Sequence, residues 1–273
     1  MTAVPHPDIE AIAAAAQAGL DGAVPLTPFS STHAGFDLDQ AYRVTAALRR
    51  RRIAQGARPV GRKIGFTNRT IWADYGVYAP IWGDLYDRTV RDLAGLGRCL
   101  IDHLAEPKIE PEIAVGLARA PSPAMDEAAL LDCIGWIAHG FEIVQSPFAG
   151  WRFQAPDTVA CGGMHAALLL GPRHILQPNG RARWLEALPR FGCSLARGGE
   201  ILASGSGADV LDGPLSALKH LVGLLARDPV NRPLAAGEIV TTGTLTRAVA
   251  IKPGEAWSTR LDGLPLDGIA VRF

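Results

Sequence analysis

A short segment near the middle of the chain, "PKIEPEIAVGL" at residues 107–117, places two glutamates inside an otherwise apolar stretch. Successive side chains of a β-strand point to opposite faces. An extended conformation therefore puts Glu110 and Glu112 side by side on one face with Ala114 and Gly116, and leaves the other face aliphatic. Because a solvated face more often carries long polar side chains, we expect the space above the two small residues to hold a ligand.

A third glutamate, Glu142, lies in "GFEIVQS", where an unpaired charge would be costly to bury. A helix predicted between the two strands would return it to the side of Glu110 and Glu112. Three converging carboxylates cannot all stay ionised without a cation, and oxygen ligands suit Mg²⁺ or Mn²⁺, or less well Ca²⁺. The alternative is that the three glutamates pair with arginines, which are frequent in this chain.

Lys63 is the candidate residue for contact with a substrate. In "GRKIGFTN" it shares one strand face with Gly61, Gly65 and Thr67. A lysine beside glycines and a hydroxyl can bind a carboxylate or transfer a proton. An exposed lysine on an edge strand is the competing interpretation.

Three further features carry weaker signals. The segments "SGSGAD" at 204–209 and "TTGTLT" at 241–246 can present backbone N–H groups to an anion, or can simply be turns. His165, in "CGGMHAALLLG", opens a buried strand, where a histidine can be structural or catalytic.

The composition excludes several classes of protein. The 273 residues carry 27 basic and 27 acidic side chains, so there is no basic surface typical of nucleic-acid binding. No apolar run reaches the roughly 18 residues of a membrane span. Four widely spaced cysteines form no CxxC pair, which argues against a zinc knuckle, and we expect a cytoplasmic protein. The first residues, "MTAVPHPDIE", lack the basic start of a signal peptide.

The periodicity predicts a mixed α+β chain. Helices are expected at 8–20, at 37–54 with Asp37 as the cap, at 126–139 and at 214–226. Arg49 to Arg52 are expected at a solvated helix end, and residues 72–87 in a loop. Strands are expected at "GRKIGFTN", "FEIVQS" and "HAALLLG", with a series of short strands from residue 237 onward. We therefore predict an N-terminal helical region with a first strand at 1–75, and a β-rich catalytic domain at 76–273, forming one structural unit.

The same segments resemble a known family. In order along the chain, "GRKIGFTN", "EPKIEPEIAVGL", "GFEIVQS", "DTVA", "SGSGADVLDGPLSAL", "LAAGEIVTTGTLT" and "GIAVRF" resemble the 2-keto-4-pentenoate hydratase / 4-oxalocrotonate decarboxylase family of the fumarylacetoacetate hydrolase superfamily. The resemblance runs from about Ala47 to Phe273. It implies a mixed β-roll with an N-terminal helical region, a homo-oligomer, and a role in bacterial catabolism of aromatic compounds.

The resemblance also implies site residues and chemistry. Mg²⁺ or Mn²⁺ would be held by Glu110, Glu112 and Glu142, with Lys63 at the active site and Thr244 near the substrate carboxylate. The expected activity is that of a hydro-lyase, which hydrates an unsaturated 2-oxo acid such as 2-hydroxypenta-2,4-dienoate. The alternatives are a decarboxylase, a hydrolase of an acylpyruvate-type C–C bond, or an inactive partner subunit.

Two segments depart from the family pattern. Where the family carries an aspartate in a "PDFG"-like segment, this chain has Ile81 in "PIWG", and Asp84 or Asp87 is the candidate replacement. Where the family has "ADNAS", this chain has "ACGGMH". Met164 and His165 then replace two small hydroxyl residues, which makes His165 a candidate acid or base and Met164 a candidate substrate contact.

Aromatic residues near the first of these segments bear on the size of the pocket. Trp72, Tyr78 and Trp82 suggest a larger or more aromatic substrate pocket than a five-carbon acid needs. The competing interpretation is that they only pack the loop.

Overall fold

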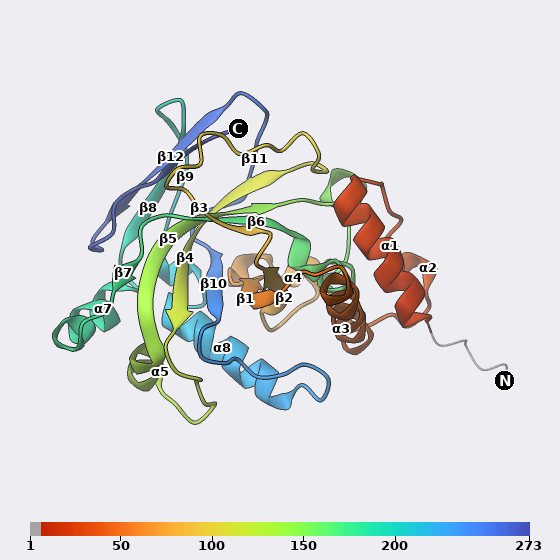
Figure 1. Cartoon of the computed structure of the whole chain (residues 1–273), viewed down its shortest axis with the longest axis horizontal. Coiled ribbons are helices and arrows are strands. Elements are labelled where there is room, and N and C mark those ends of the chain that lie inside the picture. The colour runs from red at the N-terminus through yellow and green to blue at the C-terminus, as the bar shows by residue number, and fades with distance from the viewer. Residues whose placement is uncertain (1–6) are drawn as a thin grey trace.

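The computed structural model describes residues 7–273, and it contains two β-sheets flanked by helices (Figure 1). The larger sheet has the strand order β2-β1-β10-β4-β5-β6-β3, with β11 paired to β4 and β7 paired to β5. Its strands are β1 (Pro59–Gly65), β2 (Ile81–Tyr86), β3 (Val90–Asp92), β4 (Lys108–Leu117), β5 (Ile134–Val144), β6 (His165–Leu170), β7 (His174–Ile175), β10 (Ile239–Thr244) and β11 (Val249–Ala250).

The smaller sheet, of order β13-β12-β8-β9, packs against one part of the larger one. It consists of β8 (Gly192–Arg197), β9 (Glu200–Ser206), β12 (Ala256–Asp262) and β13 (Ala270–Arg272). The two sheets bury a shared core that includes Ile109 and Phe141 from the larger sheet and Leu195 and Trp257 from the smaller one. The aliphatic face predicted for residues 107–117 is therefore buried.

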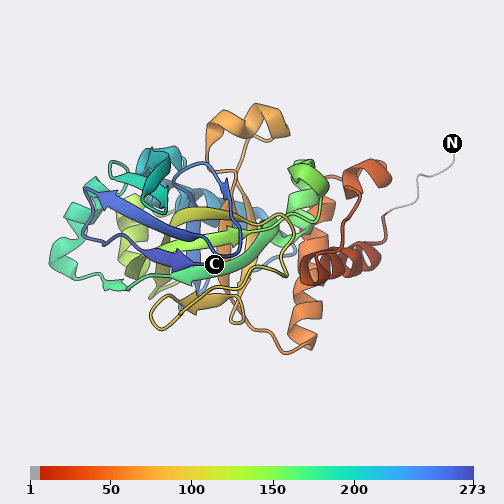
Figure 2. The same ribbon diagram turned by 90° about the horizontal axis from the view of Figure 1, so that it is seen from above.

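The helices fall into two groups. At one end of the curved sheet lie α1 (Ile9–Gly22), α2 (Phe29–Thr32), α3 (Leu38–Ala54) and α6 (Ala155–Ala160) (Figure 1). Elsewhere α5 (Glu127–Cys133), α7 (Arg181–Ala187) and the amphipathic α8 (Pro214–Arg227) pack together, and Leu218 and Leu221 of α8 share a core with Ile113 and Val115 of β4. The short α4 (Trp72–Tyr75) projects from the sheet (Figure 2).

Most predicted elements are present. Asp37 caps α3 by accepting a hydrogen bond from the backbone N–H of Gln40, and α1 and α8 lie where the periodicity placed them. The α+β class with a curled sheet and an N-terminal helical region is confirmed. Residues 1–6, which the prediction about a signal peptide includes, lie outside the described part. The division at residue 75 stays a prediction.

Two secondary-structure predictions were wrong. The helix expected at 126–139 ends at Cys133, and the chain continues as β5 from Ile134. The loop expected at 72–87 contains α4 and the six-residue strand β2, every residue of which is buried. Because both faces of β2 and most of β5 are covered, neither strand shows the alternation that identifies a half-buried strand.

The arginine cluster at the end of α3 is not simply solvated. The Arg49 side chain is 13 % exposed and its Nε lies 2.8 Å from Oδ2 of Asp84. Arg51 and Arg52 bond to Gln17 and Asp21 of α1. These contacts join α3 to its neighbours. Within residues 7–273, we find no helix whose length and hydropathy would let it cross a membrane.

Candidate metal centre and active site

Antiparallel pairing of β4 with β5 brings the three glutamates together. Glu110 lies directly opposite Glu142, and Glu112 lies opposite Gly140 in the next position on the same face. One carboxylate oxygen from each glutamate lies within 4.8 Å of the others. Glu112 and Glu142 are fully buried, whereas Glu110 is half-buried and lines a cavity of about 370 Å³.

Burial and mutual repulsion perturb this cluster strongly. Burial raises the pKa of Glu110 to about 7, and burial together with the charge of Glu142 raises the pKa of Glu112 well above its usual range. Burial acts in the same direction on Glu142, but Lys63 and the hydrogen bond with His165 outweigh it and lower the pKa of Glu142. In the absence of a cation, one negative charge therefore concentrates on Glu142.

One buried carboxylate oxygen of the cluster, Oε1 of Glu112, has no hydrogen-bond partner, and Oε2 of Glu142 has only the 3.3 Å ion pair with Nζ of Lys63. The other oxygen of Glu112 accepts a hydrogen bond of 2.9 Å from the backbone N–H of Gly243. A shift in the β10–β4 register between Thr241 and Thr244 aims this amide at the carboxylate. Buried polar atoms are normally satisfied, so the free oxygen of Glu112, beside the charge of Glu142, fits a bound divalent cation.

The arginine pairing considered from the sequence does not occur. Within residues 7–273, the ion pairs of the three glutamates involve Lys63 and His165 and no arginine. Carboxylate oxygens alone form the cluster, and such a donor set suits a hard cation rather than a thiophilic one.

Lys63 faces the cluster from β1. Its Nζ lies 3.3 Å from Oε2 of Glu142, and its side chain is 5 % exposed and contributes to the cavity wall. Burial acts to lower the pKa of Lys63, but the surrounding glutamates, above all Glu142, outweigh it and raise that pKa. The lysine stem passes close to Gly163, where a Cβ atom would lie 2.8 Å from its Cδ. A side chain at position 163 would displace the lysine.

Thr244 and Met164 also line the cavity, as the sequence predicted for substrate contacts. The Thr244 hydroxyl donates to the backbone carbonyl of Thr246 at 2.8 Å, so its oxygen remains free to accept. Met164 adopts a left-handed backbone conformation, with φ 64°. Their roles as substrate contacts stay predictions.

His165 lies behind the cluster and not in the wall of this cavity. Its Nδ1 lies 2.8 Å from Oε1 of Glu142, and its Nε2 lies 2.9 Å from the hydroxyl of Thr89. It lines a second cavity of about 360 Å³, together with Asp84. Because Glu142 stands between the imidazole and the first cavity, His165 can orient Glu142 but does not reach a molecule bound in front of the glutamates.

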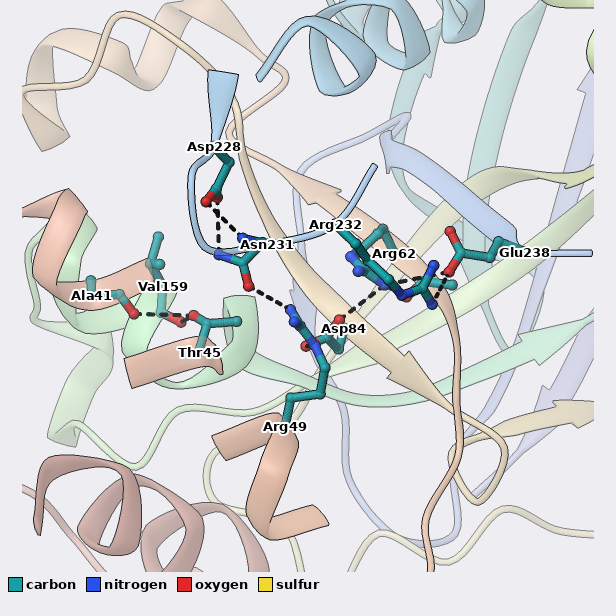
Figure 3. A network of polar contacts seen from close by, with 11 residues as sticks. Ala41, Thr45, Arg49, Arg62, Asp84, Val159, Asp228, Asn231, Arg232 and Glu238 are labelled. Atoms are coloured by element: carbon teal, nitrogen blue, oxygen red, sulfur yellow. Dashed lines mark hydrogen bonds and ion pairs between the residues drawn. The ribbon is translucent and has the colours of Figure 1, made fainter. Parts of the chain in front are cut away.

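Asp84 and Trp82 do not join the site, because β2 points both side chains to the face opposite that of Lys63. Asp84 bridges Arg49 and Arg62 at 2.8 and 3.0 Å within a buried network that continues to Asn231 and Asp228 (Figure 3). Trp82 is 1 % exposed. Its ring stacks on Tyr42 and lies under the guanidinium of Arg62.

The expected ligand space above Ala114 and Gly116 is filled by the protein itself, so this expectation was wrong. A Cβ atom on Gly116 would lie 2.0 Å from the indole of Trp136 on the neighbouring strand. Ala114 is buried in a small apolar cluster that includes Leu85 and Leu168. The cavity lies toward the other end of β4, where Lys108 and Glu110 contribute to its wall.

The aromatic side chains of the cavity are not the ones expected. Trp72 and Tyr78 do not line it, and Tyr78 is 83 % exposed. The wall instead contains Phe66, Tyr75, Trp151 and Phe153, and the cations Lys108 and Arg247. Alternation along 107–117 could have identified Lys108, which shares the face of Glu110. No local pattern marks the four aromatic residues, since they come from separate segments.

The chain is similar to known proteins over most of its length. The family model for the fumarylacetoacetate hydrolase C-terminal domain matches residues 95–267. A 2-keto-4-pentenoate hydratase of Dechloromonas aromatica is 34% identical over 261 residues, which cover 93% of this chain and 94% of that protein. A 2-keto-4-pentenoate hydratase of Paraburkholderia xenovorans is 32% identical over 243 residues, which cover 88% and 86%.

A solved structure shares the whole fold. The 4-oxalocrotonate decarboxylase of Pseudomonas putida G7, complexed with magnesium and adipate, superimposes with a TM-score of 0.85 and 27% sequence identity. The match covers 97% of each chain.

Proposed function

The chain belongs to the 2-keto-4-pentenoate hydratase / 4-oxalocrotonate decarboxylase family of the fumarylacetoacetate hydrolase superfamily, and on this premise we propose that it is a divalent-metal-dependent hydratase. Its substrate class is an unsaturated 2-oxo acid, with 2-hydroxypenta-2,4-dienoate as the simplest member. The observation that carries the proposal is the three-glutamate cluster facing Lys63, with Glu110 and Lys63 in the wall of a cavity.

Glu110, Glu112 and Glu142 would hold the cation, and Mg²⁺ or Mn²⁺ is the metal that this all-carboxylate donor set favours. The relative of known structure was solved with magnesium, which supports the same choice. When bound, the cation supplies Lewis-acid stabilisation of the enolate that forms from a 2-oxo acid. Oε1 of Glu112, which has no hydrogen-bond partner, is the atom that most needs such a ligand.

Lys63 would bind the substrate carboxylate or transfer a proton. Hydration requires the dienol to lose its 2-hydroxyl proton and gain one at C5, and water then to add across C3 and C4, with the hydroxyl at C4 and the proton at C3, which gives the 4-hydroxy-2-oxo acid. The surrounding glutamates keep the Lys63 ammonium charged, so it can hold a carboxylate or donate a proton to the substrate. The Thr244 hydroxyl, also in the cavity wall, would accept or share a hydrogen bond with the substrate head.

His165 would act as a positioning residue. Because an ionised Glu142 accepts hydrogen bonds, Nδ1 of His165 carries the hydrogen of their 2.8 Å contact. On the other side of the ring, Nε2 lies 2.9 Å from the Thr89 hydroxyl. This chain of contacts fixes the rotation of the Glu142 carboxylate, as outer partners of metal ligands commonly do.

Decarboxylation of a 2-oxo-enedioate is the second candidate. It is favoured by the relative that binds adipate, a dicarboxylate, and by the two cations, Lys108 and Arg247, in the cavity wall. Hydrolysis of an acylpyruvate has less support, because His165, the base considered for it, does not line the cavity. The homo-oligomeric state, the cytoplasmic location and the role in aromatic catabolism stay predictions.

One assay tests the proposal. Purified protein is treated with EDTA and given 2-hydroxypenta-2,4-dienoate, whose conjugated absorbance disappears on hydration. We expect no turnover until Mg²⁺ or Mn²⁺ is restored. Turnover that a chelator leaves untouched would argue against the metal, and release of CO₂ from 2-hydroxyhexa-2,4-dienedioate without hydration of the monoacid would favour the decarboxylase.

A further inference from the structure

Beyond the metal cluster, the cavity has a continuous aromatic wall. The rings of Phe66 and Tyr75 lie 4.8 Å apart between centroids, Tyr75 and Phe153 lie 5.7 Å apart with their planes at 30°, and Phe153 and Trp151 lie 6.1 Å apart. All four rings are half-buried and line the cavity. Large aromatic side chains that remain partly exposed inside a cavity offer apolar surface to a ligand.

The backbone is strained where it presents this wall. Seven non-glycine residues of the described chain have a left-handed backbone, and Phe66 (φ 54°), Trp151 (φ 58°) and Met164 (φ 64°) of these line the cavity. Bulky residues adopt this conformation at a cost, and such outliers gather at functional sites. Their concentration around one cavity indicates that the placement of these side chains matters to the protein.

Hydrogen bonds hold the strained residues in place. The indole N–H of Trp72 donates to the carbonyl of Phe66 at 2.7 Å, and the indole N–H of Trp151 donates to the carbonyl of Glu106 at 3.0 Å. An ion pair of 2.7 Å between Arg69 and Asp212 further ties the projecting segment that carries Tyr75 to the rest of the chain (Figure 2). The wall is thus built from several segments, each held in place by a hydrogen bond or an ion pair.

The cavity is also large for a five-carbon acid. Its volume of about 370 Å³ falls in the range of roughly 300–1,000 Å³ that holds drug-sized ligands. Aromatic ring faces carry partial negative charge and stack with flat apolar groups, but they repel a carboxylate. Of the two cations that could attract a second carboxylate, Lys108 already lies 3.9 Å above the Trp151 ring, and Arg247 already donates to the backbone carbonyl of Leu202 at 2.8 Å.

We propose that the substrate carries a flat apolar tail, such as an aryl group, which stacks on Tyr75 and Phe153 while its 2-oxo acid head lies at Lys63 and the glutamates. This inference rests on the proposed function for the position of the head. It narrows the proposed substrate class to dienoates that carry a flat apolar tail. Short acids and dicarboxylic acids are then not the preferred substrates.

Saturated 2-oxo acids test the tail without turnover, because they have no double bond to hydrate. Calorimetry with Mg²⁺ present compares 2-oxo-5-phenylpentanoate, 2-oxopentanoate and 2-oxohexanedioate. We expect the phenyl compound to bind at least tenfold more tightly than either of the others. Phe153→Leu or Tyr75→Leu should reduce that preference about two- to twelvefold, the range measured for an aromatic contact, and leave the affinity for 2-oxopentanoate unchanged.

Tyr78→Leu is the matched control, since Tyr78 belongs to the same projecting region but is 83 % exposed and outside the wall. Equal affinity for the three acids, or tightest binding of the dicarboxylate, would overturn the apolar tail. Should a Tyr75 variant fail to fold, the ranking of the three acids on the unaltered protein still decides. A phenyl preference without hydration of any dienoate would refute the proposed function and leave the tail standing.

Discussion

The ammonium of Lys63 lies 3.3 Å from a carboxylate oxygen of Glu142, although their strands, β1 and β5, are separated by β10 and β4 in the sheet. In a flat sheet, three strand spacings would hold the two backbones about 14 Å apart. The curl of the sheet and the length of the lysine side chain close this gap. The sheet thereby encloses the metal cluster between its strands and places one cation beside it.

Replacement of this lysine should separate catalysis from metal binding. Lys63→Met removes the ammonium but keeps all three carboxylates, so we expect kcat/KM for the dienoate to fall at least about 100-fold with no loss of Mn²⁺ affinity. Steady-state kinetics and a Mn²⁺ titration measure the two quantities separately. Retained turnover would remove Lys63 from the proposed site.

The metal-free protein should lose stability as the pH rises. The pKa of Glu110 is raised to about 7 from 4.5, so its contribution to stability is present below about 4.5 and is lost as the pH rises through about 7. The raised pKa of Glu112 adds to this loss, and His139, whose pKa burial lowers to about 4, opposes it below about pH 6.5. The lowered pKa of Glu142 and the raised pKa of Lys63 act outside this window.

Thermal unfolding in EDTA between pH 5 and pH 8 measures this effect. We expect the Tm to fall with rising pH, and the fall to be smaller in Glu110→Gln. Glu186→Gln serves as the control, because Glu186 is 73% exposed in its pair with Arg190. Added Mg²⁺ should restore the Tm most strongly at pH 8. An equal change of Tm between pH 5 and pH 8 in the unaltered protein and in Glu110→Gln would contradict the pKa of Glu110.

His165 should matter to the metal rather than to the chemical step. His165→Leu leaves the Glu142 carboxylate without its 2.8 Å partner, and loss of an outer partner commonly weakens metal affinity about 10- to 100-fold. His165→Gln, whose amide can donate to Glu142, should recover part of the affinity. Exposed His174 provides the control substitution, and unchanged Mn²⁺ affinity in His165→Leu would refute the positioning role.

Asp84 should contribute to stability and not to catalysis. Asp84→Asn removes the charge that pairs with the fully buried Arg62 and with Arg49, and breaking a buried pair costs about 3–5 kcal/mol. At about 2–4 °C for each kcal/mol, the Tm should fall by roughly 6–20 °C, with kcat of the folded protein unchanged. Asp87→Asn, at a partly exposed pair with Arg58, should lower the Tm much less. A lost kcat at normal Tm would return Asp84 to the active site.

Strand alternation and family motifs were enough to predict the glutamate cluster, but not every strand. The spacing of Glu110 and Glu112, with Glu142 about 30 residues later, predicted a cluster that the pairing of β4 with β5 brings together. The limits of β5 and the whole of β2 were missed, because strands buried on both faces have no alternation. The spacing of apolar residues three or four apart favoured a helix up to residue 139, but the helix ends at Cys133.

The remaining errors concern residues whose contacts come from neighbouring strands. Asp84 was considered a replacement catalytic acid because it is near Ile81 in sequence, but the pairing of β2 with β1 places it on the face opposite Lys63, where it pairs with the buried Arg62. Gly116 was thought to leave room for a ligand, yet Trp136 fills that space from β5. Neither partner can be identified from local sequence, since each contact depends on strand pairing and register.

The most direct test of the central claim is a Mn²⁺ titration followed by electron paramagnetic resonance. We expect the chelated protein to bind one Mn²⁺ per chain, Glu112→Gln to lose that site, and Glu186→Gln, altered at an exposed position, to keep it. Undiminished Mn²⁺ binding in Glu112→Gln, or no stoichiometric binding by the unaltered protein, would contradict a metal centre at Glu110, Glu112 and Glu142.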